Sequence, residues 1–173
     1  MMPRCYKWLL LALLGAAYFL HQADRALFGI LTIPIQEELS ISTRQIGWIN
    51  AVLSWTIAIA TTIAGVLGNR LSKKWTITVS LISWSVATLC MGFINEFSVC
   101  GVAISAFAVT LSLRSIAVGV GESFYGPSAM ALLASYHTDT RSSAFSLHQS
   151  SLYIGLMMCG TICAALLSLF GSW

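Results

Sequence analysis

The stretch that decides the fold reads Arg114-Ser-Ile-Ala-Val-Gly119-Val-Gly121-Glu122, and it places two charges inside a long apolar segment. An arginine at the centre of a membrane helix costs about 2.5–3.5 kcal/mol on the insertion scale. A chain that needed only to cross a bilayer would carry leucine there. Because charges buried in membrane helices usually mark a route for ions or polar solutes, this stretch predicts a membrane protein that moves solutes.

Composition agrees with a membrane location. Of the 173 residues, 57% are hydrophobic and only 9% are charged, whereas an ordinary soluble domain is about 25% charged. The mean hydropathy is +0.82. The net charge of +3 is small and gives no reason to expect a nucleic-acid partner. The five cysteines lack the Cys-x-x-Cys spacing of zinc or redox sites, so we expect no metal and no cofactor. Cys159 and Cys163, one helical turn apart, are interpreted as small packing residues.

Five apolar segments are each long enough to span a bilayer, which takes about 20 residues. The sequence therefore predicts an all-α membrane protein with a single transmembrane domain, residues 1–173. The predicted helices cover residues 7–33, 46–67, 75–93, 101–133 and 144–170. Pro34 is expected to end the first helix and Pro127 to bend the fourth. The intervening links, residues 36–45, 68–74, 95–98 and 137–143, are short, so consecutive helices should be antiparallel neighbours.

The N-terminal segment has two interpretations. Arg4 and Lys7 followed by an apolar run are also typical of a signal peptide. Because apolar character resumes at Ala26 and recurs to the C-terminus, we interpret the segment as a first membrane helix.

Loop charges predict a cytoplasmic N-terminus. In that orientation the outer links carry Arg44 as their one cation, beside Glu37, Glu38 and Glu96. The inner segments carry Arg4, Lys7, Arg70, Lys73, Lys74 and Arg141. This excess follows the positive-inside rule. We expect a multi-pass protein of a bacterial inner membrane.

The first predicted helix contains a polar group formed by Tyr18, His21, Asp24 and Arg25. Spacings of three, four and seven residues put Tyr18, His21 and Arg25 near one face, with Asp24 adjacent. One alternative is a pair at the helix end that snorkels to the interface. Apolar residues continue to position 33, however, which places Asp24 inside the hydrophobic span. Burial favours a neutral carboxyl and a nearby cation favours a charged one, so Asp24 could take and release a proton.

The fourth and fifth predicted helices add further polar groups. Arg114 and Glu122 are eight residues apart, about 12 Å along an α-helix, so each needs a partner on another helix or in a hydrated cavity. An interhelical salt bridge is the structural alternative. Gly119 and Gly121 would let a neighbouring helix approach closely. Tyr125 could add a hydroxyl, and the fifth helix carries His148, Gln149, Ser151 and Tyr153, which are either packing residues or part of a solute path.

A basic loop completes the pattern: Gly65-Val-Leu67-Gly68-Asn69-Arg70-Leu-Ser72-Lys73-Lys74. Alone it is a basic turn attracted to anionic lipid headgroups. It also resembles the loop between helices two and three of the major facilitator superfamily, Gly-x-Leu-Ala-Asp-Arg-x-Gly-Arg-Lys/Arg. The residues that fit are Gly65, Leu67, Arg70, Lys73 and Lys74, whereas Gly68, Asn69 and Ser72 depart from the motif. Asn69 replaces an acidic residue that helps to hold the two halves of such transporters together.

The charged residues resemble the organic anion:cation symporter branch of that family. The resemblance implies that Asp24 and Glu122 carry a coupling proton and that Arg25, helped by Arg114, binds the anionic group of the substrate. Other residues expected on the substrate path are Tyr18, His21, Tyr125, His148, Gln149 and Tyr153. Residues expected in gating are Gly65, Asn69, Arg70, Lys73, Lys74 and Arg141, the last resembling the arginine that starts the fifth helix. The usual Arg-to-Glu spacing is seven; the extra residue here would turn Glu122 by about 100° on an α-helix.

The resemblance implies twelve helices in two bundles of six, and alternating access rocks one bundle against the other. This chain supplies five predicted helices. We therefore expect an N-terminal portion of a full-length parent, a truncated reading frame or one piece of a split transporter, with a C-terminal bundle as its partner. The expected parent function is proton-coupled uptake of a small organic anion such as a sugar acid.

Two rival functions are considered. A membrane enzyme would need a nucleophile and base at matched depth or a metal motif such as His-Glu-x-x-His, and the sequence has neither. We expect no enzyme activity. A non-transporting scaffold, or an inactive truncated fragment, would instead close its buried charges into salt bridges with no access to water.

Overall fold

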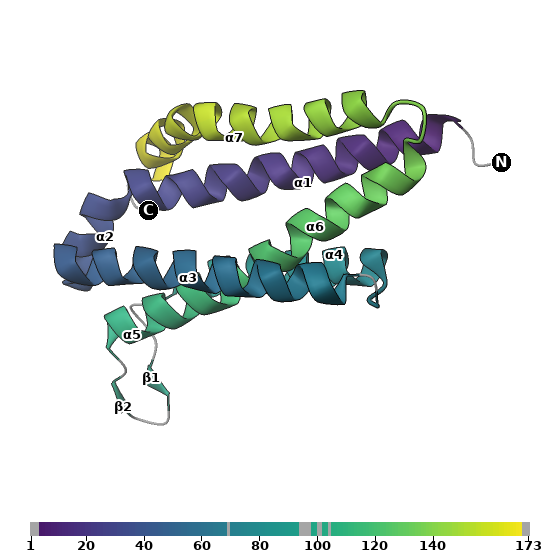
Figure 1. Ribbon diagram of the computed structural model, residues 1–173. Helices are drawn as coiled ribbons and strands as arrows, with labels where there is room; N and C mark the ends of the chain where they lie inside the picture. The colour runs from purple at the N-terminus through teal and green to yellow at the C-terminus, as the bar shows by residue number, and fades with distance from the viewer. Residues whose placement is uncertain (1–3, 69, 94–97, 100–101, 104, 171–173) are drawn as a thin grey trace. The chain divides into compact units, whose positions relative to one another are not determined.

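The computed structural model describes residues 4–68, 70–93, 98–99, 102–103 and 105–170. Helices dominate these residues (Figure 1). They are α1 (Arg4–Ile30), α2 (Thr32–Leu39), α3 (Thr43–Leu67), α4 (Lys73–Met91), α5 (Ala106–Thr110), the π-helix η2 (Leu111–Val118), α6 (Gly119–Tyr136) and α7 (Arg141–Phe170). Two short strands, β1 (Ser98–Val99) and β2 (Val102–Ala103), pair antiparallel, with Ser98 opposite Ala103 and Val99 opposite Val102.

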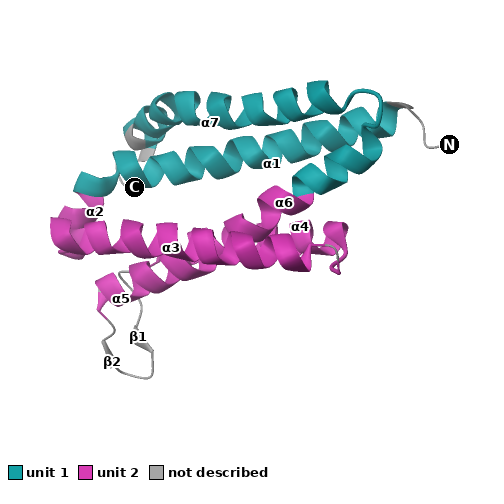
Figure 2. Cartoon of the chain, viewed as in Figure 1, with its two compact units in different colours: residues 1–33, 129–173 teal, residues 34–128 magenta. Residues whose placement is uncertain are grey.

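Three described helices are long and apolar enough to cross a membrane: Thr43–Leu67, Phe107–Tyr136 and Arg141–Leu166. The helical membrane character predicted from the sequence is therefore supported, while the count of five spans stays a prediction. The chain divides into two compact units, unit 1 with residues 1–33 and 129–173 and unit 2 with residues 34–128 (Figure 2).

The first helix ends earlier than predicted. It stops at Ile30, and Pro34 lies in the first turn of α2, where the missing N–H costs no helical hydrogen bond. The predicted link of residues 36–45 shrinks to residues 40–42, because α2 runs to Leu39. Ser42 then caps α3: its hydroxyl accepts from the Gln45 N–H at 3.3 Å, and the Gln45 side chain accepts from the Ser42 N–H at 2.8 Å.

The fourth predicted helix also has different bounds. It begins at Ala106 rather than residue 101, because Val102 and Ala103 form a strand. It widens into a π-helix at Leu111 and then continues as α6 through Pro127 to Tyr136. The predicted turn at residues 95–98 lies mostly outside the described residues.

Unit 1 is organised by a close, parallel packing of α1 against α7, which lie side by side in Figure 1. Three contacts recur one helical turn apart. A methyl group at Gly15 would lie 2.8 Å from the Ser151 hydroxyl, one at Gly155 would meet the backbone carbonyl of Phe19, and the Cys159 thiol donates to the Ala23 carbonyl at 3.2 Å. The contacting residues on α7 are all small. Small residues are what let membrane helices approach so closely.

In unit 2, α3 packs closely against η2 and α6, again through small residues. The Ser115 hydroxyl donates to the Ile49 carbonyl at 2.8 Å, and the Ser123 hydroxyl donates to the Ile57 carbonyl at 3.3 Å. Between them, a methyl group at Gly119 would lie 3.1 Å from the Thr56 side chain and 3.2 Å from the Leu53 side chain of α3. Each contact joins residues 66 positions apart, so these helices also run parallel.

The third helix of unit 2, α4, packs on the other side of this segment. Trp84 and Ala87 form a buried apolar cluster with Val118 of η2. A methyl group at Gly121 would lie 3.1 Å from the Ser80 carbonyl oxygen. The glycines predicted to allow close helix approach therefore do so against two different neighbours, Gly119 against α3 and Gly121 against α4.

Candidate functional site

Unit 1 holds an aromatic and imidazole cluster between α1 and α7. The Tyr18 ring stacks on His148, with ring centroids 4.6 Å apart and planes inclined by 15°. The His21 ring also stacks on the Tyr18 ring, but more loosely, with ring centroids 6.3 Å apart. His21 is 4% exposed and His148 is 1% exposed. Three residues from two predicted helices are thus brought together in the interior, where a polar group must be paired to be tolerated.

The other polar residues predicted on α7 lie elsewhere. Gln149 is exposed, and Tyr153 is 58% exposed. One residue turns an α-helix by about 100°, so Gln149 lies on a different face from its neighbour His148. Ser151 donates to the Leu147 carbonyl of its own helix at 3.1 Å. A place for Gln149 and Tyr153 on a solute path stays a prediction.

The charged pair of α1 sits one turn beyond His21. Asp24 is half-buried and Arg25 is exposed. The neighbouring Ala23 carbonyl accepts a hydrogen bond from the Cys159 thiol, which fixes this turn of α1 against α7. The helix therefore holds the two charges on a backbone that is anchored by packing rather than by a loop.

Arg114 is a buried charged residue of unit 2. It lies on η2 and is 5% exposed. Its neighbour Ser115 is fully buried and hydrogen-bonded to the Ile49 carbonyl, so the backbone at Arg114 is held directly against α3. Two turns farther, Glu122 is half-buried and Tyr125 is 3% exposed. The arginine lies within a helix apolar enough to cross a membrane, as the sequence predicted.

The π-helix changes the geometry expected between Arg114 and Glu122. The predicted turn of about 100° from the extra residue assumed α-helical geometry. Residues 111–118 instead form π-helical hydrogen bonds, which close one residue later than α-helical ones. A segment of this kind takes up an additional residue within its turn. The estimate that the extra residue turns Glu122 by about 100° was therefore wrong in its premise, because it assumed an α-helix. π-Helical turns are frequent at functional sites.

The basic loop joins α3 to α4 and lies at the surface. Gly68 is the C-cap of α3, and the Arg70 N–H donates to the Leu67 carbonyl at 2.8 Å. Arg70 and Lys74 are exposed and Lys73 is half-buried. Gly65 is exposed with open space around it, while Asn69 lies outside the described residues.

Arg141 begins α7, as its resemblance to the family arginine implied. It is exposed, and its guanidinium lies 5.4 Å from the centre of the Phe145 ring. That distance suits a cation–π contact.

His137 was not singled out from the sequence, which placed it in a link. It is fully buried, and both ring nitrogens have partners: Nε2 lies 3.0 Å from the Lys7 carbonyl and Nδ1 lies 2.9 Å from the Thr140 hydroxyl. A carbonyl can only accept, so Nε2 donates, and in the neutral ring Nδ1 accepts. Trp8 meets the ring edge-on at 5.1 Å. His137 therefore links the start of α1 to the turn before α7. No local sequence pattern predicts this role.

Within the described part of the chain, no group of three or more histidine, cysteine, aspartate or glutamate side chains could hold a metal ion.

The chain resembles known membrane transporters along nearly its whole length. The sequence model of the Major Facilitator Superfamily matches residues 14–173. A probable galactarate/D-glucarate transporter of Pseudomonas putida is 28% identical over 148 residues, covering 85% of this chain and 31% of that protein. A probable galactarate/D-glucarate transporter of Bacillus subtilis (strain 168) is 26% identical over 166 residues, covering 95% and 35%. A D-galactonate transporter of Escherichia coli O6:H1 is 24% identical over 155 residues, covering 89% and 34%.

The chain thus spans about a third of the length of these curated relatives. No solved structure gave a significant match.

Proposed function

Because the chain belongs to the major facilitator superfamily, we propose that it forms part of a secondary transporter for a small organic anion of the sugar-acid class. The observation that carries this proposal is the similarity to sugar-acid transporters over 85–95% of the chain. An integral membrane protein of this family is not an enzyme. Because the chain spans about a third of those relatives, we propose that transport belongs to an assembly with a second helical bundle, in the same polypeptide or another.

The substrate is recognised by arginine. A guanidinium presents a rigid fork of donors that matches the two oxygens of a carboxylate. We assign anion binding to Arg25, helped by Arg114. The burial of Arg114, only 5% exposed in an apolar helix, supports this assignment, since a charge at such a position carries a cost that a merely spanning helix avoids.

Further polar residues belong to the proposed site. Tyr18, His21 and His148 form a preorganised cluster whose hydroxyl and imidazole groups suit the hydroxyls of a sugar acid. Further path residues in this proposal are Tyr125, Gln149 and Tyr153. Gating is assigned to Gly65, Asn69, Arg70, Lys73, Lys74 and Arg141.

The proposed coupling ion is a proton, carried by Asp24 and Glu122. Both are half-buried in apolar helices, where a carboxyl group can exchange a proton as its surroundings change from wet to dry. The loop charges support a cytoplasmic N-terminus, and the three relatives described above are bacterial, which supports a location in a bacterial cell membrane, the inner one where there are two.

Uptake of radiolabelled D-glucarate tests the proposal. The longest polypeptide that contains this chain is expressed in cells lacking their own sugar-acid transporters, and uptake is measured with and without a protonophore. Arg25→Ala should abolish uptake, and Asp24→Asn should leave residual uptake that no longer responds to the protonophore. Arg44→Ala, an exposed arginine at the start of α3, is the matched control and should transport normally. Uptake that is unchanged in both test variants would remove the mechanism.

A non-transporting scaffold makes the opposite prediction about water. If the two positions face a hydrated substrate path, cysteines introduced at positions 25 and 114 should react with a membrane-impermeant thiol reagent. Inaccessibility of both positions in a folded, membrane-inserted protein would favour the scaffold.

A further inference from the structure

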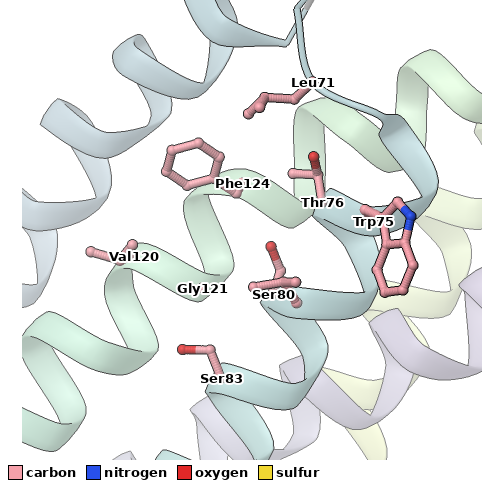
Figure 3. A pocket seen from close by; sticks show the side chains of 9 residues that line it. Leu71, Trp75, Thr76, Ser80, Ser83, Val120, Gly121 and Phe124 are labelled. Atoms are coloured by element: carbon pink, nitrogen blue, oxygen red, sulfur yellow. The ribbon is translucent and has the colours of Figure 1, made fainter.

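Unit 2 has a pocket of about 400 Å³ between α4 and α6. Its floor is formed where Gly121 brings the α6 backbone against the Ser80 carbonyl. In Figure 3, Ser80 and Ser83 of α4 face Val120 and Phe124 of α6 across the space, and Leu71 lies at one end. The lining is mostly apolar, with hydroxyl groups from α4 among it. Nothing in the proposed transport mechanism uses this pocket.

The pocket opens beside an apolar face of α4. Exposed large side chains recur at helical spacing along this helix: Trp75 (68%), Val79 (59%), Ile82 (58%), Val86 (53%) and Leu89 (65%). Trp75 and Val79 also line the pocket. In water such a stripe would be unfavourable, so in a membrane protein it indicates contact with lipid or with another helix.

Three basic residues adjoin the pocket lining in the sequence. Arg70, Lys73 and Lys74 interleave with the lining residues Leu71 and Trp75. No acidic residue occurs anywhere from Gly68 to Phe93, so nothing in this segment neutralises the three cations. Tryptophan and lysine together are typical of the level where headgroups meet hydrocarbon. The first turn of α4 therefore combines a binding surface for an anionic headgroup with the mouth of an apolar pocket.

The length of the pocket suits an acyl chain. Its α4 wall runs from Trp75 to Ser83, a rise of about 12 Å along the helix. We propose that the pocket binds one acyl chain of an anionic phospholipid, whose phosphate contacts the basic residues at the start of α4. A basic residue near the surface adds about fivefold to the affinity for an anionic lipid, so Lys73 and Lys74 give the site its headgroup preference.

Lipid retention by the full chain tests the proposal. The purified chain in detergent is mixed with palmitoyl-oleoyl phosphatidylglycerol or the matching phosphatidylcholine, and bound lipid is counted by native mass spectrometry. The wild type should retain phosphatidylglycerol at least tenfold better. Lys73→Gln with Lys74→Gln should lower retention of phosphatidylglycerol at least tenfold, without affecting retention of phosphatidylcholine.

The acyl-chain pocket is tested separately by filling it. Ser83→Trp should lower retention of both lipids at least tenfold, whereas Ser85→Trp, also exposed on α4 but outside the pocket lining, should not. If Ser83→Trp does not give a monodisperse protein, Val120→Trp fills the pocket from the α6 wall. Equal retention in the filled and control variants would overturn the proposal. So would displacement of the lipid by excess inorganic phosphate alone, which would indicate a phosphate site, or a second copy of the chain cross-linked through cysteine at position 83, which would indicate a helix in the pocket.

Discussion

The packing of α1 against α7 makes a sharp prediction about two glycines of the same helix. A methyl group at Gly155 would collide with the backbone carbonyl of Phe19, whereas one at Gly160 would meet no other atom within 4 Å. Backbone atoms cannot rotate away as a side chain can, so Gly155→Ala must push the two helices apart. Such overpacking costs about 1–3 kcal/mol.

Gly160→Ala should change the free energy of unfolding in the opposite direction and stabilise the protein. Alanine is favoured over glycine inside a helix by about 0.5–1 kcal/mol, and nothing at this position opposes the gain. The two variants should therefore differ in unfolding free energy by about 1.5–4 kcal/mol. For a chain of this size that corresponds to about 3–16 °C in apparent melting temperature.

The assay is size-exclusion chromatography of the detergent-solubilised protein after heating, with the fraction that stays monodisperse plotted against temperature. Gly15→Ala is a useful intermediate case, because the atom it would meet is the Ser151 hydroxyl, which can rotate. The expected order of melting temperature is Gly160→Ala highest, then Gly15→Ala, then Gly155→Ala. Equal melting of Gly155→Ala and Gly160→Ala would refute the close parallel packing of α1 and α7.

Three further predictions use the same assay. His137→Ala removes a fully buried ring with two hydrogen bonds, so it should cost about 1–3 kcal/mol; wild-type melting would show that this link does not tie α1 down. Ser42→Ala removes the cap of α3 and should cost about 1 kcal/mol, and Gln45→Ala, which removes the other half of the capping box, should cost less; the reverse order would contradict the cap assignment. Deleting Ser112 from the π-helix should convert that turn to α-helix and be tolerated, whereas deleting Ser146 from α7 should lower melting strongly because it rotates the start of a regular helix by about 100°; equal losses would argue against the π-helix.

The class of protein and the positions of most helices could be read from the sequence, because apolar runs between short polar links leave few alternatives. The buried arginine was equally readable, since Arg114 is flanked on both sides by residues that belong in a membrane. The end of the first helix was misplaced because Pro34 was taken as a stop. A proline in the first turn of a helix is tolerated, and α2 starts just before it.

Other features depend on pairings that no local pattern specifies. The small residues Ser115, Gly119 and Ser123 are spaced for close packing, but only the fold shows that their partner is α3. The π-helix arises from hydrogen-bond geometry rather than from any residue type in Leu111–Val118. His137 was missed for a similar reason, because its partner Lys7 lies 130 positions away.

The transporter account is tested most directly by measuring the binding of labelled D-glucarate to membranes. These membranes contain the longest polypeptide of which this chain is part. The account predicts that D-glucarate binding is saturable, that galactarate competes for the site, and that uncharged D-glucitol does not compete. It also predicts that the Arg25→Ala variant loses this binding and that the Arg44→Ala variant keeps it. Competition by D-glucitol as effective as that by galactarate, or full binding by the Arg25→Ala variant, would contradict it.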